Sequence, residues 1–155
     1  VLNQITASHI DPDKALLMYD IVIAVDTNTI NDTSVTAIAQ MCFTGKTDGV
    51  VDVNCKVWDN TKILKPEVHA WAVVINTVYS QLQNKKQNKT VAIVVDSELG
   101  ALQQYNKREK PLVQDIYLPP GYTLVYASAD TGMEFIANQL IRICDKCAGE
   151  VLSCI

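Results

Sequence analysis

Two short apolar runs in the chain each end in an aspartate. Residues 21–26 and 91–96 are rich in β-branched side chains, and they close with Asp26 and Asp96. Runs of this length and composition are typical of strands that are buried on both faces of a sheet. We therefore predict two interior strands of the same kind, each with an acid at its carboxyl end.

The segment between these runs has the pattern of antiparallel strands. Residues 35–43 are apolar enough for a strand, residues 45–49 indicate a hairpin loop, and residues 50–57 alternate with period two. Such alternation is expected of a strand with one face in solvent. Together with residues 21–26, these segments predict a three-strand antiparallel meander.

The segment after the predicted meander has apolar residues at the spacing of a helix. Pro66 stands where a first helical turn tolerates proline, and residues 68–82 carry a broad apolar stripe without glycine or proline. Residues 97–106 predict a short helix that begins at the preceding aspartate, and residues 133–147 predict the last helix.

The order of elements predicts the fold class. A Pro-Pro-Gly turn at residues 119–121 precedes a strand over residues 122–127, which gives the order β-β-β-α-β-α-β-α. This order predicts an α/β protein with a mixed five-stranded sheet, in which two parallel strands join the meander and helices cover both faces. We expect one domain over residues 1–155, with residues 1–18 as an N-terminal extension that contains a short helix over residues 14–18.

Composition restricts the class of protein. The chain has 155 residues, of which 48% are hydrophobic and 19% charged, so it can bury a core of its own. A net charge of −4 argues against a strongly basic, non-specific nucleic-acid binder. No apolar run approaches the roughly 18 residues that span a bilayer, and residues 1–14 lack a signal-peptide pattern. We expect a soluble protein, cytoplasmic or otherwise intracellular, without a membrane partner, and the odd number of cysteines favours reduced thiols.

Three acids are candidates for metal chemistry. Asp26 and Asp96 end strands that would lie side by side, and sites form outside the carboxyl ends of parallel strands. Glu67, at the start of the intervening helix, would point to the same place if that helix crosses the sheet. Carboxylates that are forced together repel one another, and a hard divalent cation removes this repulsion. The alternative is that the aspartates only start turns or cap helices.

The ordered set of motifs resembles the ribonuclease H family. The resemblance covers about residues 20–148 and rests on the aspartate at the end of the first strand, the glutamate helix at residues 66–74, the Asp-Ser turn at residues 94–97, and the closing strand and helix at residues 125–141. No single one of these motifs is specific, whereas their order along the chain is moderately so.

The resemblance implies a site and a reaction. Asp26, Glu67 and Asp96 would carry Mg²⁺ or Mn²⁺, with Asp26 shared by two ions. The reaction would be two-metal-ion hydrolysis of the RNA strand of an RNA–DNA hybrid, which makes nucleic acid the expected partner.

The chain departs from the family at several positions. The fourth carboxylate of the family falls on Asn138, which offers an oxygen without a charge, and nearby Asp130 or Glu134 could compensate. Ser128 stands at the position of the family's flexible-loop histidine.

Candidate substrate contacts follow from the same alignment. They are Asn28, Ser97 and Ser128. Two basic clusters could neutralise phosphates or be solvated linkers: Lys85, Lys86 and Lys89, and Lys107, Arg108 and Lys110. A single CxxC, Cys144 to Cys147, lacks the two further ligands of a zinc site and favours structural cysteines.

Three functional classes remain open from the sequence. The first is an active metal-dependent nuclease, which the three acids in order favour. The second is a catalytically impaired ribonuclease H-like domain that acts as a binding or scaffold module in a larger polyprotein or complex, which Asn138 favours. The third is another nuclease of the superfamily, such as a junction resolvase, which the compact chain makes less favourable.

Overall fold

A single six-stranded sheet organises the chain. The computed structural model describes residues 2–6, 18–43, 48–97, 99–128 and 136–154. The strands lie in the order β1-β4-β3-β2-β5-β6. In chain order the elements are β1 (Leu2–Thr6), β2 (Ile21–Ile30), β3 (Thr33–Phe43), β4 (Asp48–Asp59), α2 (Pro66–Asn84), β5 (Val91–Val95), α3 (Leu99–Asn106), β6 (Tyr122–Tyr126) and α4 (Ile136–Ser153).

The predicted architecture is confirmed, with one strand added. Strands β2, β3 and β4 form the antiparallel meander, and β5 and β6 continue the sheet in parallel. Strand β1 pairs antiparallel with β4 from Leu2 opposite Asp52 to Thr6 opposite Asp48, so part of the predicted extension belongs to the sheet. The helix predicted over residues 14–18 falls mainly on residues 7–17, which lie outside the described residues.

Strand β2 is longer than the sequence pattern predicted. It does not end at Asp26 but continues to Ile30, and only Asn31 and Asp32 separate it from β3. The polar part of the strand is held by side-chain pairs across the hairpin, since the hydroxyl groups of Thr29 and Ser34 lie 2.8 Å apart. Asn31 turns the chain with a φ of 54°, a conformation that asparagine tolerates better than most residues. The prediction that this strand ends at Asp26 was therefore wrong.

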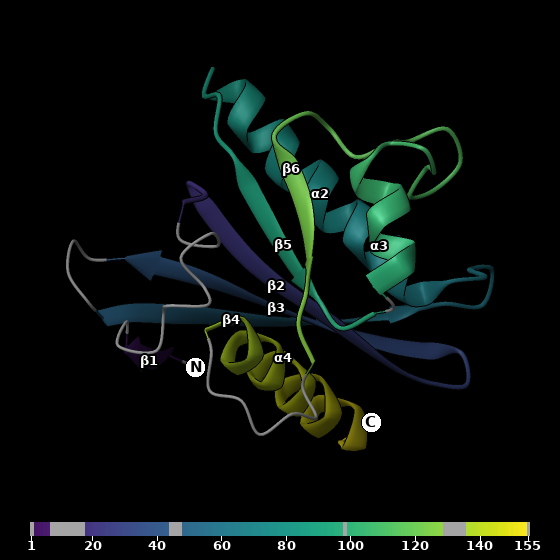
Figure 1. Ribbon diagram of the computed structural model, residues 1–155. Coiled ribbons are helices and arrows are strands. Elements are labelled where there is room, and N and C mark those ends of the chain that lie inside the picture. The colour runs from purple at the N-terminus through teal and green to yellow at the C-terminus, as the bar shows by residue number, and fades with distance from the viewer. Residues whose placement is uncertain (1, 7–17, 44–47, 98, 129–135, 155) are drawn as a thin grey trace.

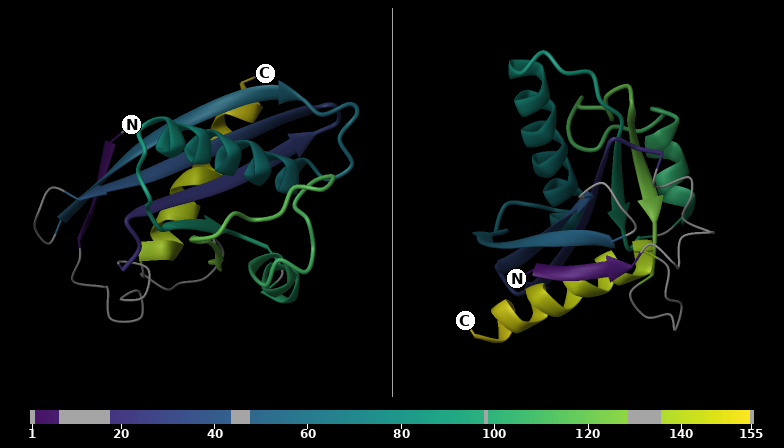
Figure 2. Two further views of the ribbon diagram at one scale, coloured as in Figure 1. Left: turned by 90° about the horizontal axis from the view of Figure 1, so that it is seen from above. Right: turned by 90° about the vertical axis from the view of Figure 1, so that its left-hand side faces the viewer.

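Helices cover both faces of the sheet, as predicted. Helices α2 and α3 pack on one face and α4 on the other, which gives three layers (Figures 1 and 2). The alternation along β2 explains this arrangement, because Val22 and Ala24 face the α4 side whereas Ile23 and Val25 face the side of α2 and α3. None of the helices in the described part of the chain is long and apolar enough to cross a membrane.

The parallel pairing of β2 with β5 fixes the geometry of the site. The two strands are in register from Ile21 opposite Val91 to Ala24 opposite Val94. Their amino-terminal ends are joined by Asp20 and Thr90, since the Thr90 amide donates to the Asp20 carboxylate over 2.9 Å. The carboxyl ends of both strands therefore reach the same edge of the paired region.

The free edge of β6 is closed by the side chain of Asn106, the last residue of α3. Its amide nitrogen donates to the Leu124 carbonyl over 2.9 Å, and its oxygen accepts from the Leu124 amide over 2.7 Å. One side chain thus satisfies the two backbone groups of Leu124 that a further strand would otherwise pair. Arg108 holds the following loop, because its guanidinium donates to the carbonyls of Leu118 and Pro119.

We expect Asn106→Ala to lower the free energy of unfolding by about 2 kcal/mol, because two half-buried backbone groups lose their partners. The matched control is Gln103→Ala on the same helix, whose side chain is exposed. Urea unfolding of both variants measures the difference. Equal losses in the two variants would show that Asn106 does not hold the β6 edge.

Candidate metal centre at the carboxyl end of the parallel strands

The three predicted acids come from three elements that meet at one edge. Asp26 lies in β2 two residues beyond the last pair with β5, and Asp96 directly follows β5. Glu67 lies in the first turn of α2, which Pro66 begins. The residue that follows β4, Asn60, is tied to the turn between β2 and β3, because its amide donates to the Asp32 carbonyl over 2.8 Å.

Asp26 is buried and lacks compensation for its charge. Only 7% of the residue is exposed, and its Oδ2 atom has no hydrogen-bond donor. The pKa of Asp26 is raised to about 7, first by burial, then by the charge of Asp145 and a side-chain hydrogen bond with it, and last by the charges of Glu67 and Asp96. Each of these three acids therefore acts electrostatically on Asp26.

Glu67 shares this environment. Its pKa is also raised to about 7, mainly because the side chain is partly buried and secondarily because of the negative charge of Asp96. The amino-terminal end of α2 favours a negative charge, but this is outweighed by burial and by the neighbouring acid. Two carboxyl groups with raised pKa values beside a third acid are typical of a functional site.

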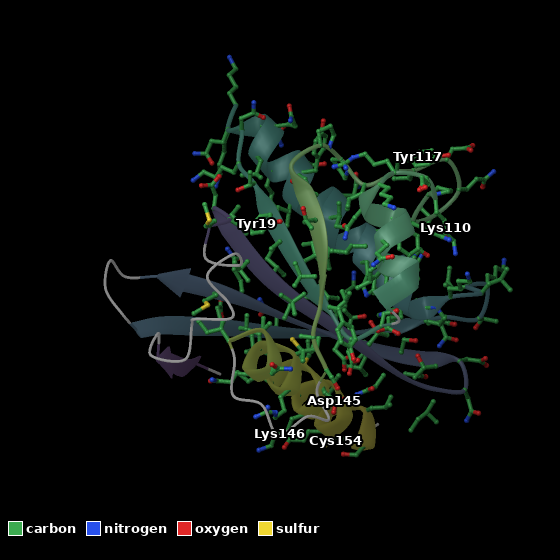
Figure 3. All side chains as sticks on the ribbon, viewed as in Figure 1. Tyr19, Lys110, Tyr117, Asp145, Lys146 and Cys154 are labelled. Carbon is green, nitrogen blue, oxygen red and sulfur yellow. The ribbon has the colours of Figure 1, made fainter. Side chains whose placement is uncertain are left out.

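Asp145 belongs to the group and was missed in the sequence. It lies on α4, below the sheet in the view of Figure 3, and its electrostatic effect on Asp26 exceeds those of Glu67 and Asp96. Asn28 fixes this part of α4 against β2 by donating to the Asp145 carbonyl over 3.3 Å. Asp145 follows Asn138 by seven residues, two helical turns, so both lie on nearly the same helical face. This seven-residue spacing was the feature of the sequence that could have identified Asp145 as a site residue.

The remaining candidates lie around the same edge. Asn138 is buried in the first turn of α4, and its amide donates to the Ser128 carbonyl over 2.9 Å. Ser97 forms a half-buried bend directly after Asp96. The acids suggested as replacements for a fourth carboxylate, Asp130 and Glu134, lie outside the described residues.

The acids have the chemistry of ligands for a hard cation, but their side chains are not arranged around a common point. Within the described part of the chain, no three carboxylate, imidazole or thiol side chains are placed closely enough to hold a metal ion. Asp26, Glu67, Asp96 and Asp145 offer carboxylate oxygens, which Mg²⁺ and Mn²⁺ prefer. The buried Oδ2 atom of Asp26 accepts no hydrogen bond, so a bound cation would compensate the charge of this atom.

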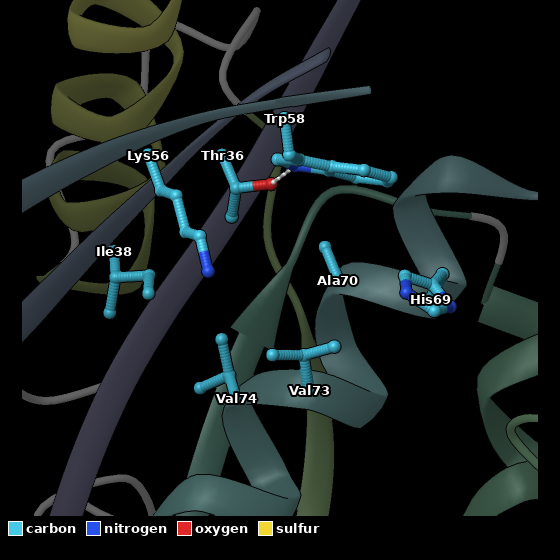
Figure 4. A pocket seen from close by; sticks show the side chains of 8 residues that line it. All are labelled: Thr36, Ile38, Lys56, Trp58, His69, Ala70, Val73 and Val74. Carbon is cyan, nitrogen blue, oxygen red and sulfur yellow. Dashed lines mark hydrogen bonds between the residues drawn. The ribbon is translucent and has the colours of Figure 1, made fainter. Parts of the chain in front are cut away.

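A groove lies beside the start of α2, between this helix and strands β3 and β4 (Figure 4). It has a volume of about 160 Å³. Trp58 and His69 form one wall, with ring centres 5.5 Å apart. The Lys56 side chain projects into it, and the residues that line it include no acid. His69 and Glu67 both lie near the start of α2, and residues two apart in a helix point to different sides of it.

The two predicted basic clusters differ in their surroundings. Arg108 donates to four backbone carbonyls, and the Lys110 ammonium lies 5.3 Å from the centre of the Tyr105 ring. This cluster therefore has a structural role in the loop between α3 and β6. Lys85, Lys86 and Lys89 are exposed, and they precede β5, at the end of the strand opposite to Asp96.

The mixed sheet with helices on both faces is an α/β arrangement consistent with a ribonuclease H-like fold. No protein-family model matches the sequence, and no curated protein matches it. A solved structure of the foamy viral protease-reverse transcriptase in complex with dsDNA is similar, with a TM-score of 0.56 and 16% sequence identity over 85% of this chain and 93% of that chain. At this identity the likeness establishes the fold.

The raised pKa of Asp26 has a consequence for stability. Between pH 4 and pH 7 the folded carboxyl keeps a proton that the unfolded chain has released, so its contribution to stability falls as the pH rises through this window. We expect Asp26→Asn, without divalent metal, to raise the free energy of unfolding at pH 8 by about 4 kcal/mol, because the pKa rises from 3.8 to about 7 and one pKa unit corresponds to about 1.4 kcal/mol. The gain should shrink as the pH falls towards 4.

Urea unfolding at pH 8 and pH 4 in the presence of EDTA measures this difference. Asp20→Asn is the matched control, because hydrogen bonds from Thr90 lower the pKa of Asp20 and the same substitution there should not stabilise the protein. A loss of stability in Asp26→Asn at pH 8 would mean that the ionised carboxylate is satisfied in the fold.

Proposed function

We propose that this chain is a divalent-metal-dependent nuclease that hydrolyses the RNA strand of RNA–DNA hybrids. The proposal rests above all on the environment of Asp26, a buried carboxyl with an unsatisfied oxygen on which three other acids act electrostatically. A fold stabilised by its own interactions alone would gain from replacing such a group. A divalent cation bound beside Asp26 would supply the compensating charge that the fold itself does not.

Asp26, Glu67 and Asp96 would hold Mg²⁺ or Mn²⁺, and Asp145 adds negative charge to the same place. A bound divalent ion supplies the positive charge that activates water and stabilises the leaving oxygen in phosphodiester hydrolysis. The carboxylates of the chain would hold the ions at the carboxyl ends of β2 and β5. Because Asp26 and Glu67 both have a pKa of about 7, ion binding and activity should rise with pH through neutrality.

Nucleic acid is the partner that the fold supports. The similar foamy viral protein was solved in complex with dsDNA, and the choice of a hybrid rests on the family resemblance of the motifs. Asn28, Ser97 and Ser128 lie in the segments that adjoin the acids and would contact the substrate strand. In this proposal Asn138 positions the loop that contains Ser128, because its amide binds the Ser128 carbonyl.

The groove beside α2 would extend this contact surface. Trp58 and His69 offer ring faces to an unstacked base, and Lys56 offers a positive charge to the adjoining phosphate. The position of His69 in the same helical end as Glu67 would let one strand reach both the groove and the acids.

We expect cleavage of a labelled RNA–DNA hybrid with Mg²⁺ or Mn²⁺ and none with EDTA, single-stranded RNA or duplex DNA. Asp26→Asn should abolish cleavage, and Asp145→Asn should reduce it at least about tenfold through weaker ion binding. Glu150→Gln is the control on α4, because this residue is exposed further along the helix. Full activity of a folded Asp26→Asn protein would contradict the proposed site.

We expect quenching of Trp58 fluorescence when an oligonucleotide binds in the presence of EDTA. The only other tryptophan, Trp71, is 1% exposed, so the signal reports on the groove. Lys56→Gln should reduce the slope of log affinity against log salt by about one, because one phosphate contact is lost. Lys89→Gln is the matched control, and a lower slope in that variant alone would place the strand on the other basic cluster.

A second candidate function is a binding module with impaired catalysis. It is favoured by Asn138 at the position where the family has an acid, and by the lack of a closed ligand group in the described part of the chain. Oligonucleotide binding without cleavage in any metal would favour this function.

A further inference from the structure

Two thiols meet across the interface between the sheet and α4. Cys55 lies in β4, where it pairs with Ala37, and its side chain packs against the core on the α4 side. Cys147 lies on α4 and packs against the same core. The two Sγ atoms are 3.1 Å apart, although the residues are separated by 92 positions in the chain. The contact is therefore long-range in the sequence, and it forms because α4 packs against the sheet.

Exposure and contact distinguish Cys55 and Cys147 from Cys144 and Cys154 as candidates for forming a disulfide. Cys55 and Cys147 are both partly exposed, so a small reagent can reach them. Cys144 is fully buried, and its thiol points to the Ala24 carbonyl. Cys154 is exposed at the far end of α4. A disulfide has an S–S distance of about 2.05 Å, so closing the gap requires a movement of about 1 Å, which a change of side-chain torsion can supply.

We propose that Cys55 and Cys147 are an oxidation site at which a small-molecule disulfide, such as oxidised glutathione, produces a covalent bond between β4 and α4. The sulfur of one cysteine attacks the reagent, forms a mixed disulfide and releases one thiol. The sulfur of the other cysteine then attacks the bound protein sulfur and releases the second thiol. Two protein thiols are oxidised, the reagent is reduced to two thiols, and the protons of the cysteines end on these products.

The order of attack follows from the environment of Cys55. Burial and the neighbouring thiol raise the pKa of Cys55 to about 12, so it stays protonated at neutral pH. The raised pKa makes Cys55 the poorer thiol for the first attack, so in the proposed order it acts second and loses its proton as it displaces the reagent. Geometry promotes this second step, because the two sulfurs are already in contact.

The bond would hold the helix that carries Asp145, which lies two residues before Cys147. It would also close a long loop, which constrains the unfolded chain and stabilises the folded one. This inference goes beyond the proposed function and does not depend on it, because the disulfide forms or fails to form whether or not the acids bind metal.

The experiment incubates the folded full chain with oxidised glutathione, in a Cys154→Ser background that removes the exposed thiol. Mass spectrometry of the intact protein and of its peptides should find the loss of two hydrogens and a single bond between Cys55 and Cys147. Dithiothreitol should reverse it. The oxidised protein should melt about 10 °C higher than the reduced one.

Cys55→Ser and Cys147→Ser are the controls, and each should leave the protein without an internal disulfide. Retention of both free thiols in a large excess of the reagent would overturn the proposal, as would stable glutathione adducts without closure. A bond between any other pair of cysteines would overturn it as well.

Discussion

The parallel pairing of β2 with β5 is the constraint on which the rest of the site depends. Once Ile21 to Ala24 are in register with Val91 to Val94, the acids that follow both strands reach the same edge. Backbone hydrogen bonds and a two-sided apolar core hold this register, so the repulsion between carboxylates cannot be relieved by strand separation. The sheet thus holds Asp26 in a place where its ionisation is unfavourable, which is reflected in a pKa of about 7.

The helices complete the site from opposite faces. Helix α2 brings Glu67 from one side, and α4 brings Asp145 from the other, so that Asp26 is acted on by acids from both layers. The α4 side of the core contains small side chains, among them Ala24, Ala37 and Ala39, which let the helix approach the strands closely. The thiol contact between Cys55 and Cys147 is a further result of this close approach.

Much of this arrangement could be predicted from the sequence. The β-branched runs before Asp26 and Asp96 indicated buried parallel strands, and a proline at a helix start indicated the position of Glu67. The predictions that failed concern residues whose structure depends on partners elsewhere in the chain. The far half of β2 was missed because its threonines are polar, and only the hydroxyl pairs with β3 reveal a strand. Asp145 was missed because its role depends on where α4 crosses the sheet, which no local pattern specifies.

The most direct test of the account is the proton balance of metal binding. Titration calorimetry with Mn²⁺ at pH 6.5, in buffers of different ionisation enthalpy, measures the protons released per ion. Because Asp26 and Glu67, each with a pKa of about 7, are both largely protonated at this pH, the account predicts the release of roughly 1.5 protons as the ion binds. In Asp26→Asn only Glu67 remains, so the release should fall to about half of this value. Binding without proton release, or with the same release in that variant, would contradict the claim that the ion neutralises this buried group of acids.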